Sequence, residues 1–124
     1  MSDRPLAQLS GRWVGWWVQQ NTKGHQAMML MFREGTISGK GQDQSGRFDV
    51  SGEYDEPDVQ LTKIYPGWEV RYFGTYGGEM ISGRWTITSA GGYDAGVFEI
   101  WPEGDRLDVE ALMEEKAREL IESR

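Results

Sequence analysis

The residues best suited to binding chemistry are a lysine amine and several tyrosine hydroxyl and tryptophan indole groups. Between residues 47 and 88, apolar and polar side chains alternate in short runs, which predicts strands with one apolar face. That face also carries one lysine, and an amine in a largely apolar cavity would suit the carboxylate of a small, partly apolar ligand. The predicted ligand-binding residues are Tyr54, Lys63, Tyr65, Tyr72, Tyr76 and Trp85.

The same residue types also permit a purely structural interpretation. Lys63 would then lie at the rim or pair with an Asp or Glu, and the tyrosine hydroxyls would satisfy one another. Tyr and Lys are common structural residues in barrels, so residue types alone favour this interpretation. The choice between the two depends on whether the interior is hollow or filled.

No catalytic or metal-binding residue is predicted. His25 is the only histidine, and it stands beside a polar turn without an evident carboxylate partner. Asp43 stands in a turn between Gly41 and Gly46 but lacks the alternating carboxylates of a calcium loop, so we interpret it as a turn residue that bonds nearby amides. The chain holds no cysteine, which excludes disulfides and thiolate zinc sites, and we expect no cofactor.

An all-β framework must position these residues. Eight short runs are separated by turns rich in Gly, Asn, Asp and Pro, and no helical pattern lies between them, so consecutive strands must be antiparallel. We predict an eight-stranded up-and-down barrel over residues 11–102, with an open sheet or a sandwich as the alternative. The predicted strands are 12–20, 25–33, 36–42, 47–54, 58–65, 68–76, 81–88 and a last one that carries Phe98 and Ile100.

Two flanking segments differ from the strand pattern. Residues 1–10 are a lead-in whose Leu6 and Leu9 can pack one turn against the barrel. Residues 103–124 read as an acidic amphipathic α-helix, because apolar residues recur there at a spacing of three to four.

The first two predicted strands carry more apolar surface than one barrel wall can bury. Both parities are apolar in each of them, so the sequence does not show which side of the first strand faces inward. The outer side needs cover, either from the C-terminal helix in a monomer or from a second copy in a homodimer. The predicted interface residues are Trp16, Met29, Met31, Leu112, Met113 and Leu120.

Gly11-x-Trp13, at the start of the first strand, resembles the Gly-x-Trp signature of the calycins, the β-barrel group that includes lipocalins and avidins. The length and the eight-strand meander are more similar to an avidin than to a lipocalin. The resemblance implies a closed barrel with a ligand in its mouth. In avidins an Asn follows the first Trp, whereas Val14-Gly15-Trp16-Trp17 follows here, so the resemblance transfers no biotin-binding residue.

Composition limits the classes of partner. The chain has 124 residues and a net charge of −7, with a pI near 4.7, which argues against binding to nucleic acid or to an anionic membrane. It has no transmembrane-length apolar stretch, so a cytoplasmic location is the default expectation, although a removed signal peptide would leave no trace.

The first functional hypothesis is therefore a non-enzymatic protein that binds a small, partly apolar ligand in the barrel mouth. The alternative is an interaction module that uses the first two strands and the C-terminal helix around a filled barrel. An isomerase-like or cyclase-like barrel enzyme is the third hypothesis.

Overall fold

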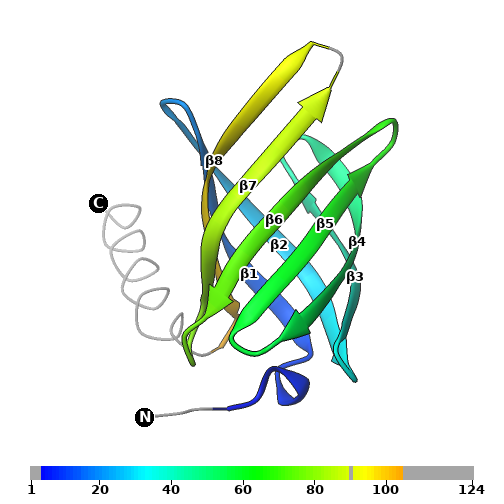
Figure 1. Cartoon of the computed structure of the whole chain (residues 1–124), viewed down its shortest axis with the longest axis vertical. Coiled ribbons are helices and arrows are strands. Elements are labelled where there is room, and N and C mark those ends of the chain that lie inside the picture. Colours follow the sequence, from blue (N-terminus) through cyan, green and yellow to red (C-terminus); the bar gives the residue numbers. More distant parts are fainter. Residues whose placement is uncertain (1–3, 90, 105–124) are drawn as a thin grey trace, which may run out of the picture.

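The chain folds into a closed antiparallel barrel. A computed structural model describes residues 4–89 and 91–104 (Figure 1). A short 3-10 turn, η1 (Leu6–Gln8), precedes eight strands that pair in sequence order, and the last strand returns to the first. The strands are β1 (Gly11–Gln19), β2 (Thr22–Arg33), β3 (Thr36–Asp43), β4 (Gly46–Asp55), β5 (Asp58–Tyr65), β6 (Trp68–Tyr76), β7 (Ile81–Ser89) and β8 (Gly92–Pro102).

The predicted all-β meander barrel is thus confirmed. From position 105 onward, the helix predicted over residues 103–124 lies outside the described residues. Within the described ranges, no helix combines the length and the apolar character needed to cross a lipid bilayer.

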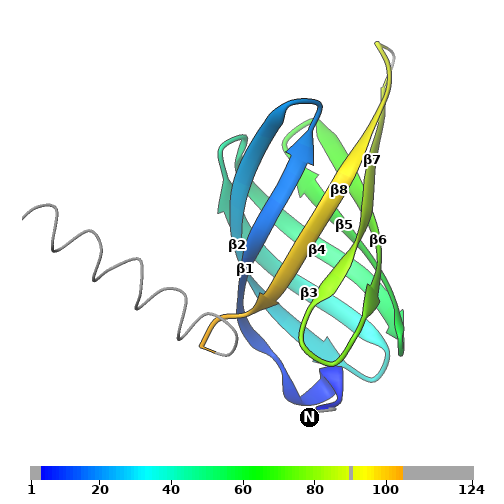
Figure 2. The same ribbon diagram turned by 90° about the vertical axis from the view of Figure 1, so that its left-hand side faces the viewer.

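The barrel closes between β1 and β8, which pair from Trp13–Pro102 to Val18–Val97. Figure 2 looks onto this seam, with β8, β1 and β2 side by side. Closure requires a close approach of the two backbones: a Cβ on Gly15 would lie 1.9 Å from the Glu99 carbonyl oxygen. The same crowding meets a Cβ at Gly39, Gly52 and Gly83, so these mid-strand glycines permit the tight coiling of the sheet.

Large rings fill the interior. Pairing with β8 turns Trp13, Gly15 and Trp17 inward, which settles the orientation of β1 that its two apolar parities left open. Glycines on neighbouring strands make room for the indoles, because a Cβ on Gly24 would lie 2.1 Å from the Trp17 ring and one on Gly96 would lie 2.6 Å from Trp85. In the core, the indole rings therefore pack directly against the backbone of glycines on neighbouring strands.

The two ends of the barrel differ. At the lower end in Figure 1, η1 lies across the opening, and Leu6 and Leu9 are buried, as predicted. The Trp13 indole donates to the Leu9 carbonyl oxygen at 2.8 Å, and the Tyr76 hydroxyl lies 2.7 Å from the Arg4 carbonyl oxygen. These contacts fix the N-terminal segment as a plug.

The hairpin of β7 and β8 projects beyond the opposite end (Figure 1). Pairing of β7 with β6 ends at Thr86, and pairing of β8 with β1 ends at Val97. Beyond these points the two strands pair only with each other.

Substitution of Gly15 by Ala should destabilise the fold, because the new methyl group would collide with the β8 backbone. We expect a loss of about 1–3 kcal/mol in the free energy of unfolding, measured by urea denaturation. Gly77→Ala is the matched control, since a Cβ there meets nothing within 4 Å. Equal stability of the two variants would contradict the tight seam between β1 and β8.

Candidate binding site at the barrel mouth

A buried ion pair lies inside the barrel near its unplugged end. Lys63 on β5 and Asp43 at the end of β3 both point inward, and Lys63 Nζ lies 2.9 Å from Asp43 Oδ2. Their side chains are 1% and 2% exposed. The Tyr65 hydroxyl donates to the same Asp43 oxygen at 2.5 Å, and the Ser45 backbone N–H donates to Oδ1 at 2.8 Å. Both oxygens of the carboxylate are therefore engaged.

Aromatic rings complete the surroundings of the ammonium group. Lys63 Nζ lies 4.4 Å from the ring centre of Phe48 and 5.0 Å from that of Tyr72, within the range of cation–π attraction. The Tyr72 hydroxyl donates to Gln26 Oε1 at 3.2 Å, and Gln26 in turn donates to the Trp16 carbonyl oxygen. The polar contacts inside this half of the barrel thus join side chains that come from β2, β3, β5 and β6.

The environment changes how these groups titrate. Burial lowers the pKa of Lys63 to about 8, although the nearby Asp43 carboxylate acts in the opposite direction. Burial also raises the pKa of Tyr65, and its hydrogen bond to Asp43 raises it further. The pKa of Tyr72 is raised by burial and by the Asp43 charge. Both phenols therefore stay protonated at neutral pH.

A small cavity opens above this cluster. Its volume is about 50 Å³, enough for roughly four water molecules and too little to enclose a fatty chain. Lys63 is not part of the lining, whereas its partner Asp43 is. The lining consists of Trp17, Gln19, Asp43, Ser45, Tyr65, Trp68, Val70, Tyr72, Trp85 and Ile87.

Trp68 forms an exposed part of the rim. Its ring stacks on Tyr65 with a centre-to-centre distance of 4.0 Å and an interplanar angle of 2°. The residue remains 41% exposed. A flat indole face is thus presented at the cavity entrance.

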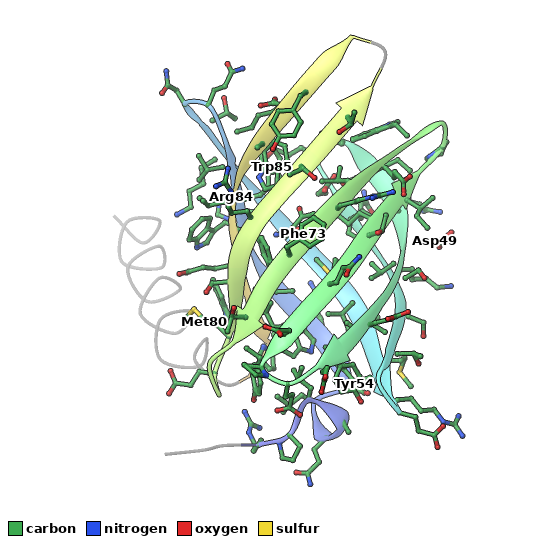
Figure 3. The ribbon with its side chains drawn as sticks, viewed as in Figure 1. Asp49, Tyr54, Phe73, Met80, Arg84 and Trp85 are labelled. Atoms are coloured by element: carbon green, nitrogen blue, oxygen red, sulfur yellow. The ribbon has the colours of Figure 1, made fainter. Side chains whose placement is uncertain are left out.

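The six predicted ligand-binding residues all belong to the interior, but they do not form one site. Lys63, Tyr65, Tyr72 and Trp85 lie around the mouth, where the Trp85 indole donates to the Val18 carbonyl oxygen at 3.0 Å. Tyr54 and Tyr76 belong to the plugged end: Figure 3 shows Tyr54 beside η1 and Trp85 in the opposite half, and the Tyr76 hydroxyl meets the N-terminal segment.

Lys63 pairs with a carboxylate, as the structural interpretation predicted. The expectation that the tyrosine hydroxyls satisfy one another is wrong. The hydroxyl of Tyr65 bonds to Asp43, that of Tyr72 to Gln26, and that of Tyr76 to backbone carbonyls. Tyr65 and Tyr72 thus find their acceptors on β3 and β2, and Tyr76 finds its acceptors in the N-terminal segment and in the turn that follows β6.

Sequence reasoning missed several residues of the mouth. Asp43 was expected only to form a turn, and it does bond the Ser45 amide, but its second oxygen holds Lys63. Asp43 follows Gly39 and Gly41 at every second position of β3, so its side chain points to the same inward face. This alternation was the signal available in the sequence. Trp17 and Trp68 were also missed as lining residues.

The predicted interface residues of the first two strands lie on the outside of the barrel. Met29 and Met31 are 49% and 54% exposed, and Trp16 is partly covered by Lys23, whose Nζ lies 4.7 Å from the ring centre. Leu112, Met113 and Leu120 lie outside the described residues.

Among residues 4–89 and 91–104, no three His, Asp or Glu side chains are grouped so that they could hold a metal ion. Comparisons with known protein families, with curated proteins and with solved structures gave no match.

Removal of either member of the ion pair should leave an uncompensated buried charge. We expect Asp43→Asn and Lys63→Met each to cost about 3–5 kcal/mol of unfolding free energy, and the double variant to cost much less than the sum. Urea denaturation of the four proteins measures this coupling. Strictly additive costs would show that the two groups do not stabilise each other.

The stability of the protein should also depend on pH through Lys63. In the folded protein Lys63 loses its proton near pH 8, whereas in the unfolded chain it has the ordinary lysine pKa of 10.5. Between these two pH values the unfolded chain therefore binds more protons than the folded protein. Between pH 8 and 10, the unfolding free energy of the wild type should rise relative to that of Lys63→Met by up to about 1.4 kcal/mol per pH unit.

Tyr65 and Tyr72 are present in both proteins, so their effects cancel in this comparison. Arg71→Met, which removes an exposed cation from the outer face of β6, controls for the loss of a positive charge. A difference between wild type and Lys63→Met that does not vary with pH would contradict the effect of burial on Lys63.

Proposed function

We propose that this chain is a calycin-like, non-enzymatic binding protein whose barrel mouth takes up one ring of a small planar ligand. The observation that supports the proposal is the asymmetry of the barrel. η1 plugs one end, while the other end leads to a cavity walled by indole and phenol rings. A largely preformed, mainly aromatic hollow with a few polar groups is the usual form of a small-ligand site.

The walls favour a flat ligand. Trp68 already stacks on Tyr65 and keeps its other face accessible at the rim, so an aromatic ring can continue that stack. The cavity is about 50 Å³, so the ligand inserts one edge and lies across the rim with the rest.

The charges favour an uncharged ligand. Lys63 is neutralised by Asp43 and lies behind the lining, so the carboxylate partner first expected for it is replaced by a residue of the chain itself. The polar groups left at the mouth are the Ser45 hydroxyl and Gln19, whose amide nitrogen already donates to Asp94. These groups suit the amide or the ring nitrogen of a neutral heteroaromatic compound.

A matched set of three compounds tests this proposal: indole-3-carboxamide, indole-3-carboxylate and cyclohexanecarboxamide. We expect the first to bind most tightly, because it is both planar and uncharged, with affinities measured by ligand-observed NMR and thermal shift. Trp68→Leu should weaken its binding about two- to tenfold, the effect of one aromatic stack.

Phe73→Leu is the matched control, since Phe73 is comparably exposed but lies on the outer face of β6. Absence of binding by all three compounds, or equal affinities of the two leucine variants, would refute the site. Stronger binding of the carboxylate than of the amide would refute the preference for an uncharged ligand.

A further inference from the structure

The outer surface of the barrel carries a second feature, a groove over β2 and β3 that is bordered by Arg12 of β1 and Arg47 of β4. Its volume is about 750 Å³. The floor is apolar, with Ala27 and Met29, and the borders are cationic, with Arg12, Lys40 and Arg47. A cationic groove is unexpected on a chain of net charge −7.

Two of the three groove cations are not neutralised by an ion pair. Arg12 pairs with Glu103, whereas neither Lys40 nor Arg47 forms an ion pair with any residue in the ranges 4–89 and 91–104, although Asp49 lies across from Lys40 in the register of β3 and β4. Asp43 also borders the groove, but its carboxylate is occupied by Lys63. The groove therefore presents positive charge around an apolar floor, a combination that suits an acidic amphipathic segment.

The chain itself supplies such a segment next to the groove. After β8, the Glu103 backbone N–H donates to the Arg12 carbonyl oxygen at 2.8 Å, and the Glu103 carboxylate pairs with the Arg12 side chain. Because Arg12 also borders the groove, the chain leaves β8 beside one of the groove's border residues. The remaining residues, 105–124, include seven acidic and four basic side chains.

We propose that residues 105–124 form an amphipathic helix that docks in the groove of their own barrel. Its apolar stripe, which includes Leu112, Met113 and Leu120, lies over Ala27 and Met29, and its acidic residues face Lys40 and Arg47. A helix of this length spans about 30 Å, more than the roughly 10 Å between β1 and β3 that separates Arg12 from Lys40 across Met29. The short connection from Gly104 gives the segment a millimolar effective concentration, which favours its own barrel over a second copy.

Paramagnetic relaxation in the full-length chain tests this docking. The chain has no cysteine, so Ala111→Cys, on the helix face opposite the apolar stripe, gives a single site for a nitroxide label. We expect amide signals of residues 27, 29, 40 and 42 to lose intensity when the label is oxidised, and those of residues 64 and 73, on the outer faces of β5 and β6, to keep theirs. Equal intensities at both sets would overturn the proposal.

A mixed sample identifies the chain that supplies the helix. Isotope-labelled protein without nitroxide is combined with unlabelled protein that carries it, and we expect no intensity loss. Loss at residues 27, 29, 40 and 42 in this sample would show that the segment docks on a second copy, which would overturn docking within one chain.

Charge reversal tests the role of the groove cations. Lys40→Glu combined with Arg47→Glu should reduce the intensity loss within the labelled chain. Arg71→Glu combined with Arg84→Glu, at exposed outward positions of β6 and β7 outside the groove, should not. Equal effects of the two pairs would overturn the electrostatic part of the docking.

Discussion

Hydrogen bonding between β1 and β8 is the constraint on which the rest of the structure depends. It gives every strand two neighbours and shuts the interior off from water over most of its length. Closure at this tight curvature requires backbone contact at Gly15 and at the other crowded glycines. It also fixes the volume inside, which large rings then fill. A polar group that points inward must therefore find its partner within the barrel, either another inward-pointing side chain or a backbone carbonyl.

That requirement explains the cluster at the mouth. An isolated buried ammonium would be strongly destabilising, so Lys63 is accommodated by a carboxylate and by two ring faces. Asp43 ends β3 and accepts a hydrogen bond from the Ser45 amide in the turn that follows, so the ion pair also fixes the position of this turn at the rim. Burial still outweighs the attraction of Asp43, which is why the pKa of Lys63 falls. The plugged end, in contrast, satisfies its polar groups with backbone carbonyls.

The strands were the predictable part of the fold, because each has a two-residue period that ends at a strong turn signal. The bounds of β5 and β6 match the prediction, since Pro57 and the pair Pro66-Gly67 delimit them. β2 begins three residues earlier than predicted, because its polar Thr22 and Lys23 still pair with β1. The contact between Lys63 and Asp43 was not predictable, since it depends on the stagger of β3, β4 and β5 and joins residues twenty positions apart.

In the projecting hairpin of β7 and β8, neighbouring strands no longer pair with both sides of each strand. Beyond Thr86 on β7 and before Val97 on β8, each described strand pairs along one side only. An edge of this kind can accept an added strand, although the Ala95 amide is already bonded to the Asp94 side chain. The exposed Tyr93 side chain adds a sticky surface, and the acidic Asp94, tied to Gln19, adds a charge that disfavours sheet-to-sheet association. Within the described residues, this tip is therefore the part of the barrel most open to strand addition. It also carries the acidic side chain that opposes such association.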